Sequence, residues 1–510
     1  MRNMELSDAK KMKAADEAAI CDGGMDSKAL MERAARELLK AAVTYMEPGK
    51  HMVVFAGPGN NGGDGLALAR LFRQMDAAGE ARVLFVGNRE KMTPDTRAME
   101  EKLLATGGQV EPFVPGDSAL GELCAGAGVI VDAIFGIGLS RELSGDALAA
   151  VELINASGAP VVSADIPSGV SADSGRILGA AVAADCTVTF SRAKPGHFLE
   201  PGCVCRGELR VADIGIPEEL CRKAGCGLYA IRGEDLHLPF RKPISHKGDY
   251  GKLLIVGGSI PYTGAPTLAA KAAVRGGAGL VYLGVPSDIY EIEAVKNQEA
   301  IVFPLASGEK GRVSRRAWDS VAERLKACDV CVLGPGMGRG EDTRAITALV
   351  LKNSGIPVLA DADALWAIAE DTSMLDGAAC PVVLTPHEGE FQRLLGRPVE
   401  DRVADARGYA KAHRCAVVLK GHRTVCAFPD GKAYIIDAGN PGMAKGGTGD
   451  VLAGVLGAML CQMSFRRAIV TGCWLHARAG DLAEKRFGEY AMQAGDMIEC
   501  LTMAELEILR

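Results

Sequence analysis

The stretch "HMVVFAGPGNNGGDGLALARLFRQM", residues 51–75, runs from an apolar segment through a glycine-rich segment into a helical pattern. It predicts a strand over 52–56, a tight turn at the glycines and a helix over 66–75. A second stretch, "AGNPGMAKGGTGDVLAGVLGAML" at 438–460, repeats the glycines and the helix, and each stretch holds a single Asp. Because backbone N–H groups at a helix start bind anions, the two stretches predict two nucleotide sites.

Apolar runs separated by helical patterns continue along the rest of the chain. They cover 82–87, 128–136, 159–169 and 186–191 in the first half, and 252–259, 279–286, 329–338, 356–365, 380–391 and 415–436 in the second. Apolar strands that alternate with helices are typical of parallel sheets covered on both faces. The sequence therefore predicts the α/β fold class, with two doubly wound α/β/α domains.

A charged stretch rich in Pro and Gly, 207–251, interrupts this alternation and predicts a domain boundary near residue 225. We expect one domain over 1–220, a linker over 221–240 and a second domain over 241–510. At 510 residues the chain is too long for one ordinary hydrophobic core, which agrees with two domains.

The composition narrows the class of protein. The chain is 48% hydrophobic and 24% charged with a formal charge of −7, which is typical of a globular protein without a basic surface for nucleic acid or acidic membranes. Its longest apolar run, 451–463, is shorter than the roughly 18 residues that span a bilayer. Residues 1–20 are charged and helical in pattern, so we expect no signal peptide and a cytoplasmic location.

The fifteen cysteines are predicted to be reduced thiols, most of them small buried side chains. Four of them fall in one short segment: Cys203, Cys205, Cys221 and Cys226. Zinc binding is the alternative for this group, although a C-x-C pair followed by a pair with a four-residue gap departs from common zinc spacings.

The glycines of the second stretch indicate a reaction as well as a ligand. Gly446, Gly447 and Gly449 let the backbone approach an anion, because no Cβ stands in the way. The helix over 450–460 would direct its first N–H groups and its dipole toward that anion. Asp450 does not favour a phosphate, so we expect it to act as a general base beside a transferring phosphoryl group. The alternative is a structural helix start with Asp450 as its N-cap.

Longer motifs make both halves of the chain similar to known families. In the second half "AKGGTGDVLAG", "GPGMG", "ADADAL", "LTPHEGEF", "LKGHRT" and the stretch 246–281 resemble the ribokinase-like carbohydrate kinases, and among them the ADP-dependent NAD(P)H-hydrate dehydratases. In the first half "LMERAA", "GPGNNGGDGLALAR", "VDAIFGIGLSREL", "ADIPSGV" and "AKPG" resemble the NAD(P)H-hydrate epimerases. The resemblance covers nearly the whole chain and implies a Rossmann-like N-terminal domain and a ribokinase-like C-terminal domain.

The resemblance implies the repair of reduced nicotinamide cofactors that have added water across a ring double bond. The first domain would interconvert the S and R hydrates, NADHX and NADPHX. The second would remove water from the S form while ADP, as co-substrate, becomes AMP and phosphate. The resemblance also implies K⁺ and Mg²⁺ as cofactors and a homo-oligomer as the assembly.

For the dehydratase domain the resemblance implies that Asp450 faces the hydroxyl of the hydrate as the base. The residues expected to contact the hydrate are Ala265, Gly336, Gly338, His387 and Asp450. Those expected to contact the adenine nucleotide are Lys420, Gly421, His422, Arg423, Thr424 and Gly449. Asn440 and Lys445 are further candidates in the glycine segment, whereas Asp361 and Asp363 are expected to hold a metal or the structure. Without the surrounding motif, the alternative for His387 is a hydrogen-bonded structural histidine, and the alternative for Lys420 is a solvated lysine on the surface.

For the epimerase domain the resemblance implies a hydrate site built from Asn60, Asn61, Gly62, Gly63, Asp64, Gly136, Ile137, Gly138, Leu139, Ser140, Arg141, Glu142 and Asp165. We expect Asp165 to act as acid or base at the epimerised carbon, with Lys194 as the second candidate. The structural alternative for Asp165 is a carboxylate that caps the "IPSG" turn.

Three of the matched positions are expected to hold potassium: Asn61, Asp132 and Ser168. Oxygen ligands that carry one negative charge in total suit a large monovalent cation better than zinc, calcium or magnesium. The alternative is a polar hydrogen-bonded cluster around a water molecule.

Two other functions fit parts of the sequence. One is a small-molecule kinase of the ribokinase-like type, which would yield a stable phosphorylated product. The other is an N-terminal half that binds nucleotides without catalysis. The motif "TPHEGEF" and the intact "NNGGDG", "VDAIFG" and "DIPSG" favour the two repair activities.

Overall fold

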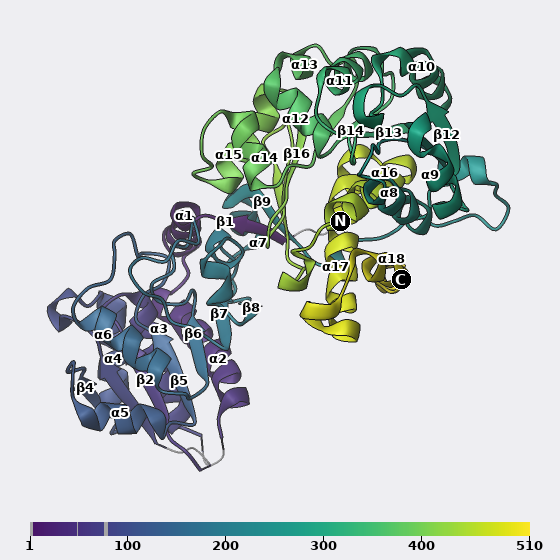
Figure 1. Cartoon of the computed structure of the whole chain (residues 1–510). Helices are drawn as coiled ribbons and strands as arrows, with labels where there is room; N and C mark the ends of the chain where they lie inside the picture. The colour runs from purple at the N-terminus through teal and green to yellow at the C-terminus, as the bar shows by residue number, and fades with distance from the viewer. Residues whose placement is uncertain (1–3, 48, 76–79, 510) are drawn as a thin grey trace. The chain divides into compact units, whose positions relative to one another are not determined.

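The computed structural model describes residues 4–47, 49–75 and 80–509, and Figure 1 shows its elements. The chain forms two compact units that divide between Leu228 and Tyr229. This division lies inside the stretch expected to be a linker, and the outer ends of the two expected domains, residues 1 and 510, lie outside the described residues. Each unit is an α/β structure with a mostly parallel sheet, which confirms the predicted fold class.

The N-terminal unit contains a sheet of seven parallel strands. Their order across the sheet is β4 (Val110–Pro112), β3 (Ala81–Phe85), β2 (Met52–Ala56), β5 (Val129–Ala133), β6 (Val161–Ala164), β7 (Cys186–Phe190) and β8 (Glu208–Ala212). This is the Rossmann order with one further strand, and the order reverses between β2 and β5. In such sheets ligands bind outside the carboxyl ends of the strands at the point of reversal. The strands β4 and β8 lie outside the predicted apolar runs.

Helices cover both faces of this sheet (Figure 1). One face carries α2 (Ser27–Tyr45), α3 (Asn60–Arg73) and α4 (Pro94–Ala105), and the other carries α5 (Ser118–Ala125) and α6 (Asp146–Ala156). Within β2, Met52 and Val54 pack on the first group, whereas Val53 and Phe55 pack on the second. All four are fully buried, so the continuous apolar run of this strand follows from cover on both faces.

The helix after β2 begins earlier than the sequence predicts. α3 starts at Asn60, so the glycine-rich segment forms the first turns of the helix, and the prediction of a separate turn before residue 66 is wrong. A Cβ at Gly62 would collide with the carbonyl oxygen of Gly57, and one at Gly65 would collide with the side chain of Ala133. These glycines therefore allow the helix to pack closely on the chain around it, a requirement that the sequence pattern does not distinguish from anion binding.

The C-terminal unit has a longer sheet. Its strand order is β12 (Ile301–Leu305), β11 (Leu280–Pro286), β10 (Lys252–Val256), β13 (Val330–Leu333), β14 (Val358–Ala360), β15 (Val382–Leu384), β16 (Ala416–Leu419), β17 (Val425–Ala427), β18 (Ala433–Ile436) and β9 (Gly225–Ile231). The strands from β12 to β16 are parallel, and β17 is antiparallel to both of its neighbours, β16 and β18. The single run predicted over 415–436 is thus three strands, and β12 was not predicted.

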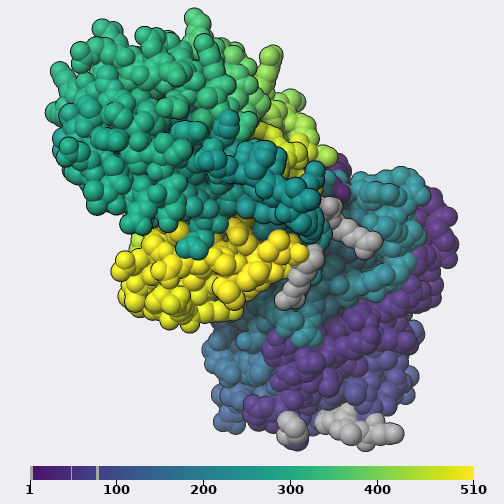
Figure 2. Space-filling model, turned by 90° about the vertical axis from the view of Figure 1, so that its right-hand side faces the viewer, coloured from purple at the N-terminus to yellow at the C-terminus, as the bar shows by residue number. Residues whose placement is uncertain are grey.

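Helices also cover both faces of this second sheet. The larger core lies under α8 (Gly264–Arg275), α16 (Thr448–Gln462), α17 (Phe465–Ala491) and α18 (Ala494–Ile508). The other helices are α9 (Tyr290–Lys296), α10 (Trp318–Ala327), α11 (Glu341–Asn353), α12 (Asp363–Glu370), α13 (Ser373–Asp376), α14 (Glu388–Leu395) and α15 (Arg402–Ala412). A Cβ at Gly454 of α16 would collide with the carbonyl oxygen of Ala269, so α16 and α8 pack with their backbones close together. The last residues of the chain, in yellow, gather on one face of this unit (Figure 2).

The stretch expected to be a linker is structured. It contains the end of α7 (Glu218–Lys223) and the strand β9, which lies beside the short strand β1 (Met4–Ser7). After β1, the helix α1 (Ala9–Cys21) packs its buried residues against α7. Among the described residues, no helix combines the length and the apolar character that crossing a membrane requires.

Candidate active sites

A cavity of about 610 Å³ opens at the carboxyl ends of β2, β5, β6 and β7 in the N-terminal unit, next to the point where the strand order reverses. Its lining includes most of the residues predicted for this site: Asn60, Asn61, Asp64, Gly136, Ile137, Gly138, Leu139, Asp165 and Lys194. The helices α1 and α2 add an apolar wall that includes Met12, Leu30 and Met31, and α1 also adds Asp16.

Asp165 and Lys194 form a buried ion pair in this cavity. The Lys194 Nζ lies 2.6 Å from the Asp165 Oδ1, and the two residues are 1% and 8% exposed respectively. Thr189 donates a further hydrogen bond to the same carboxylate at 3.0 Å. Burial pushes the pKa of Asp165 upward, but the Lys194 ammonium outweighs burial and holds the pKa below its usual value. Asp165 is therefore an ionised carboxylate at neutral pH.

The backbone of Asp165 is held in an uncommon conformation. Its φ is 65°, in the left-handed region that residues with a side chain rarely adopt. The Nε2–H of His197 donates to the carbonyl oxygen of Asp165 at 2.8 Å, and the Nδ1 of His197 accepts from the backbone N–H of Lys194 at 3.0 Å. Burial lowers the pKa of His197 to about 3, so this ring is neutral and structural. Strained residues held this way are frequent at active sites, where the fold must aim one side chain.

The three residues predicted to hold potassium lie on different elements. Asp132 is fully buried on β5 and accepts hydrogen bonds from Ser168 Oγ at 2.6 Å and from Ser163 Oγ at 2.8 Å. Within the described part of the chain it has no ion-pair partner, and burial raises its pKa against the opposing hydrogen bonds. Asn61 lies in the first turn of α3, and its buried Nδ2 has no hydrogen-bond partner among the described residues.

Two further carboxyl groups line the same cavity. Asp64 is buried on α3, and burial together with the charges of Asp165 and Asp16 raises its pKa well above the usual value. Asp16 is half-buried on α1, and burial raises its pKa to about 6. One cavity thus contains an ionised carboxylate and two carboxyl groups that retain a proton to higher pH.

Some residues predicted for this site do not line the cavity. Gly62 and Gly63 pack against neighbouring atoms inside the unit, and Ser140, Arg141 and Glu142 are exposed after the loop that does line it. Their predicted contact with a hydrate is not supported by the described lining.

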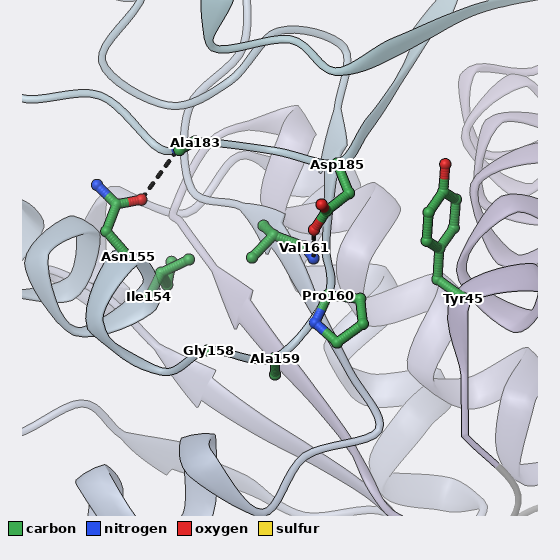
Figure 3. A pocket seen from close by; sticks show the side chains of 9 residues that line it. All are labelled: Tyr45, Ile154, Asn155, Gly158, Ala159, Pro160, Val161, Ala183 and Asp185. Carbon is green, nitrogen blue, oxygen red and sulfur yellow. Dashed lines mark hydrogen bonds between the residues drawn. The ribbon is translucent and has the colours of Figure 1, made fainter.

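A second cavity of the N-terminal unit, of about 300 Å³, lies at the opposite edge of the sheet, where β6 and β7 begin (Figure 3). Two of its polar side chains are engaged by backbone N–H groups, and the hydroxyl of Tyr45 donates to the carboxylate of Glu208 at 3.1 Å. The Asn155 Oδ1 accepts from the N–H of Ala183 at 2.9 Å, and the Asp185 Oδ2 accepts from the N–H of Val161 at 2.8 Å. No residue predicted for catalysis or binding lines it, so the cavity at the carboxyl ends is the candidate site.

In the C-terminal unit the predicted residues gather at the carboxyl ends of β14, β15 and β16 and at the start of α16. Lys420 follows β16, and its Nζ donates to the Oδ1 of Asp361 at 3.0 Å, with the Oε2 of Glu390 at 3.9 Å. Thr385 donates to the same oxygen of Asp361 at 2.7 Å. Lys420 is therefore held by an inner carboxylate and is not the surface charge that its residue type alone suggests.

Asp450 lies in the first turn of α16, half-buried and near this group. Burial raises its pKa to about 7, the charges of Asp361 and Asp363 act in the same direction, and Lys420 opposes them. No hydrogen bond from the described residues satisfies its carboxylate, so Asp450 is not the N-cap of α16. The carboxylate is available to a reacting group near neutral pH.

The glycines before α16 leave open space. A Cβ at Gly446 would meet no atom within 4 Å, and one at Gly449 would meet only the Nζ of Lys420, at 3.5 Å. Gly447 has a φ of 97° and needs to be glycine for that reason. This opening at the start of a helix, beside a lysine, fits the predicted approach of a phosphate.

The residues predicted to contact the hydrate continue from this group along the sheet edge. A Cβ at Gly336 would lie 3.1 Å from that of Ala265, and Gly338 donates its N–H to the Oδ2 of Asp363 at 2.7 Å. His387 begins α14, with its side chain 59% exposed and its ring 3.5 Å from the carboxylate of Glu390. Asp363 thus shapes the backbone of the glycine turn, in agreement with its expected structural role.

The remaining candidates have mixed surroundings. Gly421 lies against Arg402, Arg423 pairs with Asp437 at 3.3 Å, and Thr424 donates weakly to the carbonyl of Gly421 at 3.4 Å. The other two hold the backbone: Asn440 accepts from the N–H of Gly442 at 3.0 Å, and Lys445 donates to the carbonyl oxygens of Tyr490 and Met492 at 2.6 and 2.8 Å.

The zinc alternative finds no support. Among the described residues, no group of His, Cys, Asp or Glu has an arrangement that would hold such a metal ion. The Sγ of Cys221 points to the carbonyl of Ile216 and that of Cys226 to the carbonyl of Leu6, so the segment does not gather its thiols.

Three residues near the sites were not singled out by the motifs. Asp16 interrupts the apolar side of α1 between the buried Met12 and Ala19, which is the signal that a close look at the helical period offers. Glu390 caps α14 as part of "HEGE". His476, in α17, donates its Nε2–H to the carbonyl of Thr448 at 2.8 Å, and no local pattern links it to α16.

These two units define a class of protein: an enzyme with two doubly wound α/β domains, each with an acid–base centre at the carboxyl edge of its sheet. A family model described as NAD(P)H-hydrate dehydratase matches residues 253–503, and one described as YjeF-related protein N-terminus matches residues 27–196. The bifunctional NAD(P)H-hydrate repair enzyme of Moorella thermoacetica is 38% identical over 511 residues, which cover 98% of this chain and 96% of the relative. That of Escherichia coli is 35% identical over 482 residues, 92% of this chain and 88% of the relative. The chain belongs to the family of bifunctional NAD(P)H-hydrate repair enzymes.

The C-terminal unit is similar to solved structures. One is a ribokinase-like superfamily protein from Enterococcus faecalis, with 26% identity, a TM-score of 0.49, and coverage of 56% of this chain and 98% of that one. Another is the ADP/ATP-dependent NAD(P)H-hydrate dehydratase from Bacillus subtilis, co-crystallised with ATP/Mg²⁺, with 30% identity, a TM-score of 0.47, and coverage of 53% and 95%.

Proposed function

We propose that the N-terminal unit epimerises the S and R forms of NADHX and NADPHX, and that the C-terminal unit dehydrates the S form with ADP as co-substrate. The family membership supports both activities. The observation that carries the residue assignment is the pair of acid–base centres, Asp165 beside Lys194 and Asp450 beside Lys420, each at the carboxyl edge of its own sheet.

In the dehydratase unit the residues of the chain have separate roles. Asp450 takes the proton of the hydrate hydroxyl as its oxygen attacks the β-phosphorus of ADP, and AMP leaves. Lys420, with the open N–H groups near Gly449, binds the transferring phosphoryl group. The C–O bond then breaks with loss of phosphate and a ring proton, and the ring double bond is restored. The sum is hydrate plus ADP giving NAD(P)H, AMP and phosphate.

The nucleotide is proposed to lie along Lys420, Gly421, His422, Arg423, Thr424 and Gly449, and the hydrate beside Ala265, Gly336, Gly338 and His387. We propose that Mg²⁺ accompanies the phosphates of ADP, because phosphate oxygens suit that hard cation. When bound, Mg²⁺ would neutralise phosphate charge.

In the epimerase unit Asp165 is proposed as the base at the carbon that changes configuration, with Lys194 fixing its charge. The hydrate would be held by Asn60, Asn61, Asp64 and the loop 136–139, which line the cavity. The ion pair of Asp165 and Lys194 is already complete, so this carboxylate is ionised before any ligand arrives.

K⁺ is proposed to bind at Asn61, Asp132 and Ser168. One feature supports the fit: Asp132 is a buried carboxylate without a cationic partner among the described residues. Asn61 would bind the ion through its amide oxygen, because its Nδ2 is a hydrogen-bond donor. The loop 134–136 joins these residues, because Phe135 donates its N–H to Ser168 Oγ at 2.9 Å and Gly136 lies against Asn61. When bound, K⁺ would offset the charge of Asp132 and of substrate phosphates.

We also propose a cytoplasmic location and a homo-oligomeric assembly. The fifteen cysteines and the metabolic role support a location in the reducing cytoplasm. A homo-oligomer is supported by β8, an edge strand of its sheet on which Val211 is exposed.

The test is to incubate the full chain with a mixed S/R hydrate, ADP, Mg²⁺ and K⁺. We expect the absorbance of reduced nicotinamide to recover for both epimers, with AMP and free phosphate formed in equal amounts. A small-molecule kinase fused to a binding module would instead give a phosphorylated product and leave the R form unprocessed. That result would refute the proposal.

A further inference from the structure

Asp16 is a carboxyl group of the N-terminal cavity that the family motifs do not include. It lies on α1, next to the buried Ala15 and between Met12 and Ala19, so the helix presents it at its inner edge. The apolar side of α1 packs in a cluster that includes Ile137. Ile137 in turn donates its N–H to the Oδ2 of Asp165 at 3.3 Å. The packing of α1 against Ile137 thus holds Asp16 beside the residue that hydrogen-bonds to Asp165.

Asp16 has no structural task of its own. Its carboxyl group makes no hydrogen bond and no ion pair within the described part of the chain, although it is half-buried. By contrast, Asp8 caps the start of the same helix, accepting from the N–H of Lys11, and Glu17 pairs at 3.9 Å with Lys13. A half-buried carboxyl without a partner weakens the fold, so its place in a cavity beside Asp165 needs a reason in the reaction.

We propose that Asp16 is a second catalytic acid–base group of the epimerase site and acts on the same hydroxyl-bearing carbon as Asp165. This rests on the proposed function of the N-terminal unit. Water adds to the dihydronicotinamide ring at a carbon beside the ring nitrogen, because the nitrogen lone pair stabilises a cation there. The same property allows the C–O bond to break again without any redox step.

The step balances with the groups in the cavity. Protonated Asp16 donates its proton to the hydroxyl oxygen, the C–O bond breaks, and water leaves as the nitrogen lone pair forms a C=N⁺ bond. A water molecule then adds to the other face of this carbon, and the proton it loses goes to the carboxylate of Asp165. Proton exchange with solvent returns both groups to their starting states. The hydrate has the same composition before and after, with the opposite configuration.

The charges around Asp16 and Asp165 give the two carboxyl groups different pKa values. Asp16 faces Lys13 and Glu17 on its own helix, Asp64 on α3, Asp165 after β6 and Lys194 after β7, and the cavity wall also holds Lys91 and Asp95. Lys194 is bonded to Asp165 and not to Asp16, so Asp165 ionises at lower pH than Asp16, whose pKa burial raises to about 6. Two carboxyls with separated pKa values are the usual arrangement of an acid and a base in one site.

The test compares Asp16→Asn with Glu17→Gln, its exposed neighbour outside the cavity lining, in the full chain. We expect Asp16→Asn to slow S/R interconversion by about 10²–10⁴-fold, the usual effect of removing a general acid. Glu17→Gln should stay within about twofold of the unchanged protein, because an exposed charge outside the site contributes little. Dehydration of purified S hydrate should be unchanged in both, which shows that each variant is folded in the other unit.

Two readouts distinguish proton transfer from a structural role. The unchanged protein should lose epimerase activity as pH rises through about 6, the pKa of Asp16, and this limb should be absent in Asp16→Asn. Formate added to Asp16→Ala should restore part of the rate by replacing the missing carboxyl.

Failure of the Asp16 proposal can be distinguished from failure of the epimerase assignment. Epimerisation by Asp16→Asn within twofold of the unchanged protein, while Asp165→Asn is inactive, would overturn this inference and leave the epimerase assignment intact. No interconversion by the unchanged protein would overturn the epimerase assignment itself. If Asp16→Asn does not fold, Asp16→Glu decides, because a carboxyl retained at this position should keep the acidic limb and the rate.

Discussion

The two glycine-rich segments look alike in sequence, but the structure uses them differently. In the N-terminal unit the segment is helical, and Gly62 and Gly65 are small because the chain around them leaves no room. In the C-terminal unit Gly446 and Gly449 face open space at the start of α16. A glycine-rich helix start therefore indicates that other atoms approach the backbone closely. Only the packing shows whether those atoms belong to the protein or to a ligand.

The acids of the two segments differ in the same way. Asp64 is buried within α3, where burial and the charges of Asp165 and Asp16 raise its pKa well above the usual value, whereas burial raises the pKa of Asp450, in the first turn of α16, to about 7. The ionised acid of the N-terminal unit is instead Asp165, from the end of β6. The nearest lysine explains the contrast: Lys194 bonds to Asp165, but Lys420 bonds to Asp361 and leaves Asp450 without a partner.

The largest effect is expected from Asp450→Asn, which tests whether the unpaired acid of the C-terminal unit is its catalytic base. We expect ADP-dependent dehydration to fall by about 10²–10⁴-fold, because the base is removed, while epimerisation is unchanged. The matched control is Asp319→Asn, since Asp319 is also in the first turn of a helix but is exposed.

The stability of Asp450→Asn gives a check on folding. The folded pKa of about 7 exceeds the usual 3.8, so native stability is lost as pH rises from about 4 to 7 while the unfolded chain ionises first. A neutral Asn avoids this loss, and the variant should unfold at a higher temperature at pH 8. Full dehydratase activity in such a folded variant would remove Asp450 from the mechanism.

The next largest effect is expected from Lys194→Met, which should lower the free energy of unfolding of the N-terminal unit. It leaves the carboxylate of Asp165 buried without its partner, and breaking such a pair costs about 3–5 kcal/mol. Denaturant unfolding of the N-terminal unit measures this loss. Lys420→Met should destabilise its own unit less, because the Lys420 side chain is 21% exposed and its change should mainly weaken ADP binding. Equal losses of unfolding free energy in the two variants would refute the claim that Lys194 stabilises its unit more than Lys420 does.

The pH dependence of dehydration should follow Asp450. As a base it acts without its proton, so kcat/KM for the S hydrate should rise about tenfold per pH unit below about 7 and level off above. Initial rates from pH 5 to 9 with saturating ADP would show it. The residual activity of Asp450→Asn should lack this rise, and a persistent rise would assign it to another group.

The smallest effect is expected from potassium, and in the N-terminal unit only. Replacing K⁺ by a bulky organic cation should weaken hydrate binding to the epimerase a few-fold, in the range of about 1 kcal/mol. Asn61→Ala should remove the response to K⁺. Dehydration of the S hydrate is the internal control, and epimerase kinetics indifferent to K⁺ would leave a water-filled polar cluster as the account of these residues.

The sequence was sufficient for the architecture. Apolar runs such as 52–56, 82–87 and 186–191 predict parallel strands, because strands covered on both faces need apolar side chains at every position. The observed strands begin within one residue of the start of these runs. Short strands with mixed polarity, β1, β4 and β8, escaped prediction since a local pattern has little signal for them, and β12 was missed although its five residues are apolar. The start of α3 at Asn60 escaped it too, because six glycine-rich residues do not read as a helix.

The sequence by itself also determined the family, and with it the positions of Asp165, Lys194, Lys420 and Asp450, because their motifs are local. What only the tertiary structure decided is which lysine bonds to which acid and which carboxyls share a cavity. Asp16 and Asp165 are far apart in the chain, yet α1 and the end of β6 place them on one wall. Protonation follows from burial and from the nearest charge in space, and neither can be read along the chain.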